Sequence, residues 1–334
     1  MDSSKHFETI DSDPFGRQFT AATFFDVFEP RKRRFARAPG YSPWLFRGHS
    51  DASWPLLPSA FRPLSSRYAG LLDAVSRYEK RVLETRDWSN LNSGQAEYFI
   101  NSHILMWSIS EFCKKCHEIG EIDMLDVYEG LIQSGERFFS PQRVHHCFTN
   151  SFGDVHQNLR LRFIYELAQH YGLPTHLLDW TTNPLFALHF ASRDWWNGES
   201  EGEIAVWAMS PRSNTLEFTD EFDKVYRLSV QMFHPSIKIN VHARAQMSVF
   251  TVLGEDASSE YFANVGVYPS LESLQSISPG DRVLRKYVLR REYSRDLQEL
   301  LALYGVSDVR LMPTFATAAE AARNDWIVKA FTKI

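Results

Sequence analysis

The sequence predicts an α+β fold with a small mixed or antiparallel sheet at its core. Several short apolar runs of strand length alternate with longer segments whose apolar residues recur at helical spacing. Hydrophobic residues make up 44% of the 334 residues, which is enough to form a globular core. Short strands mixed with helices in this way are typical of an α+β domain.

The chain divides into a polar N-terminal segment at 1–40, which includes a short helix, and a single domain at 41–334. Within that domain, residues at about 66–150 are predicted to be a helical insertion. Apolar residues recur there at helical spacing, for example from Leu71 to Val82. We expect this insertion to support a site that lies elsewhere in the chain.

Outside this insertion, the first elements after residue 41 are a strand, a helix and a second extended segment. Residues 44–46 form a predicted strand that ends at Arg47-Gly48, because proline and serine flank it. A helix is predicted from Asp154, a suitable N-cap, to Gly172, a suitable C-terminal stop. The sequence "THLLDW" that follows is a predicted short strand or extended turn.

Asn183 and Pro184 begin the next predicted helix, because asparagine suits the N-cap position and proline suits the first helical position. Three strands and two helices are predicted after it. In chain order these are "GEIAVWAM", "QMSVFTVLG", "RVLRKYVLR", "SRDLQELLALYGV" and "TAAEAARNDWIVKAF". Gly305 closes the first of these two helices.

Charge and cysteine content exclude several broad classes of protein. The net charge is -5, from 36 basic and 41 acidic residues, which argues against a general nucleic-acid or membrane-surface binder. Three cysteines are too few for a disulfide framework and favour a reducing cytoplasm. No apolar run approaches the ~18 residues that a membrane span needs, so we expect no membrane partner.

Familiar catalytic and nucleotide-binding motifs are absent. The sequence has no Gly-x-Ser-x-Gly elbow, no glycine-rich phosphate loop and no dinucleotide fingerprint. ATP chemistry and Rossmann-type chemistry are therefore disfavoured.

Two groups of residues have side chains of the kinds that ligate metals. They are His170, His176, Asp179 and His189 in one group and Cys113, Cys116 and His117 in the other. The first spacing matches no known metal-binding pattern, and Cys113-x-x-Cys116 lacks an evident second ligand pair apart from His145 to Cys147. Capping and buried polar contacts are therefore the favoured interpretation, and no metal is predicted. A metal-assisted hydrolase or nuclease that uses His170, His176 and Asp179 stays open as an alternative.

Two polar features remain. Arg47 can bind a pyrophosphate through two parallel hydrogen bonds, and Gly48 lets a ligand approach the backbone. Asp51 offers the structural alternative, a salt bridge to Arg47. The other feature is the run from Asp179 to Asn183, in which helix capping explains one or two polar residues but not all of them.

These features resemble the FRG-domain family, which takes its name from an aromatic-Arg-Gly motif. The segments that carry the resemblance are Phe46-Arg47-Gly48, Trp54, Leu56 to Ser59, Phe61-Arg62, "AQHYGLPTHLLDWTTNPLFALHFA", Gln246 with Phe250-Thr251, and "GVSDVRLMPTF". The resemblance covers about 41–330. The sequence departs from the family at Ser248, where glycine is common, and at His242, where arginine is common.

A second, shorter resemblance is to ADP-ribosyltransferases. It rests on Phe46-Arg47-Gly48, on Thr181-Thr182 with the following Ala187 to Phe190, and on Gln246 before "VFTV". It implies an ADP-ribosyltransferase-like fold, catalytic roles for Arg47, Thr181 and Gln246, and NAD as substrate. The implied NAD-binding residues are Arg47, Gly48, Tyr171, Asp179, Trp180 and Thr182.

The implied reaction needs a carboxylate near the ribose, because breaking the nicotinamide–ribose bond builds positive charge there. Gln246 is neutral, so Glu203 and Glu255 are candidates to supply that carboxylate. The resemblance implies a mono-ADP-ribosyltransferase or NAD glycohydrolase that is a bacterial toxin or an anti-phage defence effector. Its acceptor is a protein or a nucleic acid, and a partner protein or an antitoxin is expected. A non-catalytic module that binds a ligand or nucleic acid is the alternative.

Overall fold

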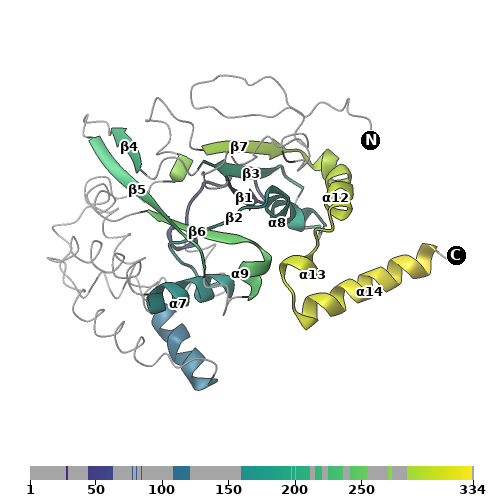
Figure 1. The fold of residues 1–334 in the computed structure, drawn as a ribbon, viewed down its shortest axis with the longest axis horizontal. Coiled ribbons are helices and arrows are strands. Elements are labelled where there is room, and N and C mark those ends of the chain that lie inside the picture. Colours follow the sequence, from purple (N-terminus) through teal and green to yellow (C-terminus); the bar gives the residue numbers. More distant parts are fainter. Residues whose placement is uncertain are drawn as a thin grey trace, which may run out of the picture.

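A computed structural model describes residues 28, 44–62, 77, 80, 84, 108–120, 159–196, 198–199, 201–210, 215–219, 225–235, 241–253, 270–272 and 284–332. These residues form a seven-stranded sheet in the order β4-β5-β6-β2-β1-β3-β7, with helices packed against it (Figure 1). Every described strand pair is antiparallel. The α+β prediction is confirmed, and the sheet is antiparallel rather than mixed.

The strands of this sheet are short. They are β1 (Leu45–His49), β2 (Leu178–Thr181), β3 (Ile204–Met209), β4 (Thr215–Thr219), β5 (Val225–Phe233), β6 (Ser248–Leu253) and β7 (Leu284–Leu289). Besides a helix at 108–118, the described helices are η2 (Ser59–Phe61), α7 (Leu159–His170), α8 (Pro184–Trp196), α9 (Val241–Ala245), η4 (Arg291–Tyr293), α12 (Ser294–Leu303), α13 (Asp308–Leu311) and α14 (Phe315–Thr332).

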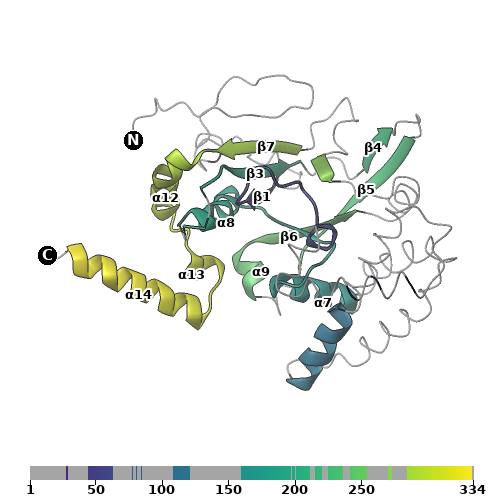
Figure 2. The same ribbon diagram turned by 180° about the vertical axis from the view of Figure 1, so that it is seen from behind.

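Helix α8 lies between the sheet and α12, as both ribbon views show (Figures 1 and 2). It is apolar on nearly every side, which suits a helix that is covered on two faces. Its residues Ala187 and Ala191 pack with Phe46 of β1 and Val206 of β3 in one buried cluster. That cluster also contains Leu297 of α12, so α8 joins the sheet to the C-terminal helices.

Helix α7 covers the neighbouring part of the same sheet face. Asp179 pairs with Phe250 across β2 and β6, and Thr181 pairs with Phe46 across β2 and β1. Paired residues point to one face of a sheet, so Phe250 and Phe46 share a face. Phe250 packs with Ile164 of α7 in a second buried cluster. Both α7 and α8 therefore cover this face, on either side of β2.

The opposite face of the sheet has its own apolar cluster. Leu45, Trp180, Trp207 and Val249 contribute to it from four adjacent strands. These residues alternate along their strands with those that face α7 and α8, as the pleat of a sheet requires. Each central strand is thus covered on both faces.

Several element boundaries match the prediction closely. Gly172 and Gly305 adopt positive φ angles, 83° and 62°, just beyond α7 and α12, which confirms them as C-terminal glycines. The strands and helices predicted after Asn183 are all present. Strands β4 and β5 and the short helices α9 and α13 were not predicted, although Leu216 and Phe218 in β4 and Leu228, Val230 and Met232 in β5 alternate with polar residues.

The remaining predictions fall largely outside the described residues. Most of 1–40 and of the helical insertion at 66–150 lies there, as does the cap expected at Asp154. Residues 108–118 of the insertion are helical and pack on α7 through Ile109 and Cys113. Helix α14 extends away from the sheet in both ribbon views (Figures 1 and 2). Among the helices that the structure describes, none combines the length and apolarity that crossing a membrane would need.

Candidate functional site

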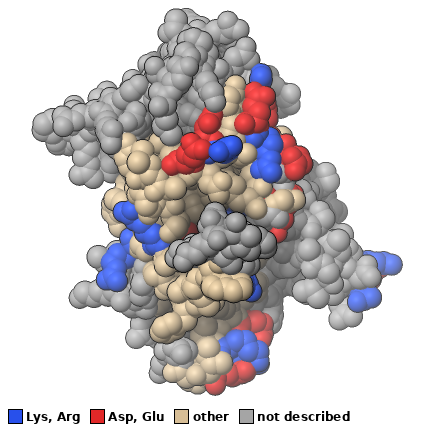
Figure 3. All heavy atoms as spheres, turned by 90° about the vertical axis from the view of Figure 1, so that its right-hand side faces the viewer, with Lys and Arg blue, Asp and Glu red and all other residues tan. Residues whose placement is uncertain are grey.

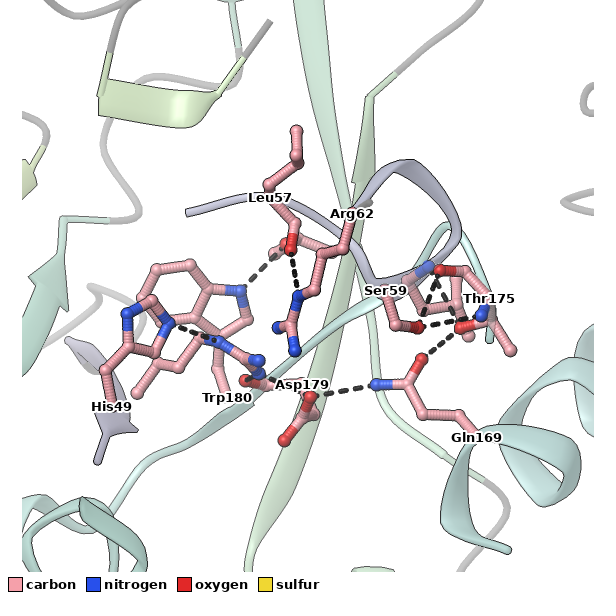
Figure 4. A network of polar contacts seen from close by, with 11 residues as sticks. His49, Leu57, Ser59, Arg62, Gln169, Thr175, Asp179 and Trp180 are labelled. Carbon is pink, nitrogen blue, oxygen red and sulfur yellow. Dashed lines mark hydrogen bonds and ion pairs between the residues drawn. The ribbon is translucent and has the colours of Figure 1, made fainter. Parts of the chain in front are cut away.

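Strands β1 and β2 separate immediately after they meet. They share a single register pair, Phe46 with Thr181, whereas β1 pairs with β3 along its whole length and β2 does so with β6. Side chains rather than main-chain hydrogen bonds therefore connect the rest of the two strands. We call this place the β1–β2 fork and define it by Arg47, His49, Arg62, Gln169 and Asp179 (Figure 4).

The Arg47 side chain spans the fork. One terminal nitrogen donates to the main-chain oxygen of Asp179 at 2.8 Å and also to the Asp179 carboxylate oxygen Oδ1. Its Nε donates to Nε2 of His49 at 3.2 Å. The Arg47 side chain is 12% exposed and that of Asp179 is 56% exposed. The guanidinium is thus held inside the fork, while the carboxylate that it contacts reaches solvent.

A second side chain holds the same carboxylate oxygen. Nε2 of Gln169, on α7, donates to Oδ1 of Asp179 at 2.8 Å. The other end of the Gln169 amide accepts a hydrogen bond from the hydroxyl of Thr175, and the Thr175 amide donates to the hydroxyl of Ser59 at 2.9 Å. This chain of contacts joins α7, β2 and η2 (Figure 4). It fixes the orientation of Asp179.

The contacts with Arg47 keep Asp179 ionised. Burial of part of the group disfavours its charged form, but the positive charge and hydrogen bond of Arg47 outweigh that effect. The pKa of Asp179 therefore lies below its ordinary value. Oδ1 accepts from Arg47 and Gln169, and no neighbouring side chain among the described residues donates to Oδ2. One carboxylate oxygen is anchored and the other is available to a ligand.

His49 is neutral in this arrangement. It is 3% exposed, and burial together with the charges of Arg47 and Arg62 lowers its pKa from 6.5 to about 3. Its Nε2 accepts from Arg47, so Nδ1 carries the proton and donates to the main-chain oxygen of Trp54 at 3.3 Å. His49 therefore orients Arg47 without adding charge.

Arg62 follows η2 and brings a second guanidinium to the fork. Its Nε donates to the main-chain oxygen of Leu57 at 3.2 Å. Figure 4 shows the rest of the guanidinium directed toward Asp179. Burial and the charge of Arg47 lower the pKa of Arg62, and the charge of Asp179 opposes them. The fork thus holds two arginine cations and one carboxylate.

A second polar group lies where β2 meets β6. The Thr181 hydroxyl donates to the main-chain oxygen of Gln246 at 2.7 Å and accepts from the amide of Asn183 at 3.1 Å. The Gln246 side chain donates through Nε2 to the main-chain oxygen of Leu311 at 3.2 Å. Met247, the next residue, has a positive φ of 51°. Thr181 therefore holds the tight turn that leads into β6.

The structure does not bring Arg47 and Thr181 into one set of contacts. Thr181 pairs with Phe46, so its side chain points to the face of α8, while the neighbouring Arg47 leaves β1 on the opposite face. For this reason the side chains of Arg47 and Thr181, two residues to which the resemblance to ADP-ribosyltransferases assigns catalytic roles, point to opposite sides of the sheet. The residue that links the two faces is Asp179, which is two positions from Thr181 and contacts Arg47 across the fork.

Two of the expected NAD-binding residues have structural environments instead. A Cβ on Gly48 would lie 2.1 Å from the Ala187 oxygen, so the glycine allows α8, not a ligand, to approach β1. Trp180 is 2% exposed and donates to the Thr251 hydroxyl at 2.8 Å, so its ring is a core element rather than a stacking surface. Tyr171 is exposed, and Thr182 donates its amide to the Met247 oxygen at 3.2 Å.

The histidines considered as metal ligands have separate neighbours. His170 stacks on His242 of α9, His176 contacts the ring of Tyr165, and His189 contacts Asp308 of α13. Within the described residues, no three His, Cys, Asp or Glu side chains are grouped so that they could hold a metal ion. The geometry gives a metal-assisted hydrolase no support in this part of the chain.

Of the two glutamates considered as the missing carboxylate, Glu203 is described and does not join the fork. Glu203 precedes β3 and lies 3.6 Å from Nε of Arg290. Glu255 lies outside the described residues. Asp179 is the exposed carboxylate that the fork presents, and its Arg47 partner replaces the Asp51 salt bridge considered from the sequence. Asp51 instead accepts from the amide and hydroxyl of Ser53.

Sequence reasoning missed His49, Gln169 and Arg62 as parts of the site. His49 follows Arg47 by two positions in a strand, so the pleat places both on one face, and that alternation could have identified it. Gln169 and Arg62 come from α7 and the loop after η2, and only the tertiary fold brings them to Asp179.

Charges on the face that carries the C-terminal helices are mixed. Figure 3 shows blue and red side chains side by side there. The ion pairs on the described part of the chain include Arg193 with Asp308, Arg290 with Glu203, and Arg295 with Glu299. The described residues of this face form no extended basic surface of the kind that nucleic-acid binding needs.

Comparison with known proteins identifies one domain. Residues 134–199 match the family model of the FRG domain, and this match includes α7, β2 and α8. It thus covers the helix that supplies Gln169, the strand that supplies Asp179 and the helix that packs on β1. No curated protein and no solved structure matches the chain significantly.

Proposed function

We propose that this chain, which carries an FRG domain at residues 134–199, is an NAD-using enzyme: a mono-ADP-ribosyltransferase or an NAD glycohydrolase. The observation that carries the proposal is the Asp179 carboxylate at the β1–β2 fork. Arg47 and Gln169 anchor one of its oxygens, and the side chain is 56% exposed.

The chemistry of NAD cleavage requires such a group. The bond between the ribose C1′ and the nicotinamide nitrogen breaks, its electron pair leaves with nicotinamide, and positive charge develops on the ribose. A fixed anion near that charge stabilises the transition state because it needs no reorganisation. Water or an acceptor group then forms a bond to C1′ and loses a proton. Asp179 is ionised and oriented before the substrate arrives, which suits this role.

Arg47 acts in this proposal by positioning Asp179. Its guanidinium is largely buried and bonded to Asp179 and His49, which leaves little of it for a diphosphate. The implied role of Arg47 as a diphosphate clamp is therefore replaced by one in which it fixes the angle and the ionisation of the carboxylate.

The strand order supports the resemblance to ADP-ribosyltransferases. The three segments that carry it are β1, β2 with α8, and the start of β6, and the sheet places them side by side in the order β6-β2-β1. Gln246 lies at the head of β6, and Nε2 of its amide donates to Leu311. Its amide oxygen is the group that we assign to a ribose hydroxyl, and Thr181 fixes the turn that carries it.

The biological setting follows from the family resemblance. We propose that the protein is a bacterial toxin or an anti-phage defence effector of the cytoplasm, that its acceptor is a protein or a nucleic acid, and that an antitoxin or another partner restrains it. Loss of NAD from cells that express the chain, and its retention in cells that express the Asp179→Asn variant, would support this setting.

The direct experiment is incubation of the purified chain with NAD and measurement of free nicotinamide. Release that depends on the protein supports the enzyme. The ion pair with Arg47 partly neutralises Asp179, and that observation favours a non-catalytic binding module as the second candidate. Binding of NAD without release of nicotinamide, even with candidate acceptors present, would favour that module and contradict the enzyme.

A further inference from the structure

The fork holds more positive than negative charge. Arg47 and Arg62 each carry one positive charge, Asp179 carries one negative charge, and His49 is neutral because its pKa is about 3. Arg47 is the ion-pair partner of the Asp179 carboxylate, because its terminal nitrogen donates directly to Oδ1. The second cation, Arg62, lacks an equivalent partner among the described residues.

Among the described residues, the terminal nitrogens of Arg62 have no hydrogen-bond acceptor, and they point into the fork (Figure 4). A guanidinium has five N–H groups, and the described contact of Arg62 uses only Nε, which donates to Leu57. Figure 4 shows the terminal nitrogens on the side of Asp179. Bonding of Nε to the loop fixes the plane of the guanidinium. The two terminal nitrogens are thus presented in the geometry that binds two oxygens of one phosphate.

We propose that Arg62 is the group that binds the diphosphate of a dinucleotide ligand at the β1–β2 fork. This inference rests on the proposed function, because it assigns NAD as the ligand. NAD carries a positive nicotinamide ring and a negative diphosphate. The fork offers the complementary pair: the available oxygen of Asp179 for the positive end and Arg62 for the negative end.

The arrangement also explains why two arginines occupy one small space. Two guanidinium groups beside a single carboxylate repel each other, and a part-buried cation without a partner is unfavourable. A diphosphate supplies the missing negative charge. The bound ligand would then neutralise the excess positive charge of the fork. In the free protein, the contacts of Arg47 with His49 and of Arg62 with Leu57 keep the two arginine side chains in position.

The test is calorimetric binding of ADP-ribose, which contains the diphosphate but lacks nicotinamide, to the wild type and to the Arg62→Gln and Arg62→Lys variants. We expect Arg62→Gln to weaken binding at least tenfold, and Arg62→Lys to weaken it less because the charge remains. Adenosine, which has no phosphate, serves as the ligand control. Arg295→Gln removes an equal charge from an 89% exposed side chain and should change nothing.

The possible results distinguish the proposed role of Arg62 from the proposed cleavage of NAD. Equal affinity of the wild type and Arg62→Gln for ADP-ribose, or no binding to the wild type, would overturn the role of Arg62. If wild type releases no nicotinamide from NAD but binds ADP-ribose through Arg62, the enzyme fails and the anion site stands. If wild type cleaves NAD and the KM of Arg62→Gln is unchanged, the enzyme stands and the anion site fails. If Arg62→Gln does not fold, the affinity of Arg62→Lys for ADP-ribose tests the role of Arg62 instead.

Discussion

Arg47 on β1 donates hydrogen bonds to both the main-chain oxygen and the carboxylate of Asp179 on β2, a residue 132 positions later in the chain. This contact joins two central strands where their own pairing has stopped. It therefore has two consequences, one for the stability of the sheet and one for the orientation of the carboxylate.

Loss of Arg47 is expected to lower stability as well as activity. Arg47→Ala removes a largely buried side chain and three hydrogen bonds, so we expect the free energy of unfolding to fall by about 1–3 kcal/mol. Arg47→Lys keeps the charge but cannot reach both acceptors. Its free energy of unfolding should therefore lie between those of the wild type and Arg47→Ala. The free energies of unfolding of the wild type, Arg47→Ala, Asp179→Asn and the double variant, measured by denaturation, form a double-mutant cycle. Additive effects of the two changes would show that the pair does not couple the strands.

The stability of the protein is expected to depend on pH through His49. The pKa of His49 is about 3 in the folded chain against 6.5 unfolded, so the unfolded chain binds more protons between these values. Stability should therefore fall as pH decreases below 6.5, by up to ~1.4 kcal/mol per pH unit from this residue. Asp179 contributes to stability over a different pH range, because its contribution is lost only as pH falls below the ordinary pKa of a carboxyl group.

His49→Gln is the matched control for this pH dependence. Glutamine can accept the hydrogen bond from Arg47 but does not titrate. Unfolding in denaturant at several pH values between 4.5 and 7 should show a shallower dependence for the variant. The same slope in both proteins would mean that other groups cause the effect.

Gly48→Ala should disrupt the packing of α8 on β1. The added Cβ would lie 2.1 Å from the oxygen of Ala187 and 2.8 Å from the nitrogen of Ala191, both main-chain atoms that cannot move alone. We expect a loss of about 3 kcal/mol or more. Gly120→Ala is the control: it meets nothing within 4 Å and should cost only about 1 kcal/mol through its positive φ of 71°. Similar melting temperatures for the two variants would contradict the packing role of Gly48.

Asn183 is confirmed as the cap of α8, because its Oδ1 accepts from the amide of Leu185 at 3.0 Å. Asn183→Ala should lower the free energy of unfolding by about 1 kcal/mol. Its rate of nicotinamide release, measured well below the melting temperature, should match that of the wild type. A large loss of rate with an unchanged melting temperature would place Asn183 in the reaction instead.

Local features of the sequence predicted much of the fold. Asn183, Pro184, Gly172 and Gly305 mark helix ends through their own backbone preferences, so they act the same way in most contexts. Strands β4 and β5 were not predicted, although apolar and polar residues alternate in both, and their place in the sheet depends on the pairing of β4 with β5 and of β5 with β6. Antiparallel pairing throughout the sheet likewise depends on contacts between distant segments.

The candidate site was harder to predict because it depends on strand register. In "LDWT", successive side chains point to opposite faces, so Asp179 and Thr181 share a face while Trp180 enters the core. That alternation could have removed Trp180 from the ligand contacts. No local rule shows that Phe46 pairs with Thr181. This pairing places Arg47 on the opposite face of the sheet from Thr181, next to the fork in which it contacts Asp179.

The rate of nicotinamide release from NAD by the wild type and by Asp179→Asn tests the account most directly. Asparagine keeps the size of the side chain and an oxygen for Arg47 and Gln169, but removes the negative charge that we assign to the developing ribose cation. We predict release by the wild type and a decrease in kcat of about 100-fold or more in the variant, with the fold retained in circular dichroism. Equal rates for the two proteins would contradict the central role of Asp179.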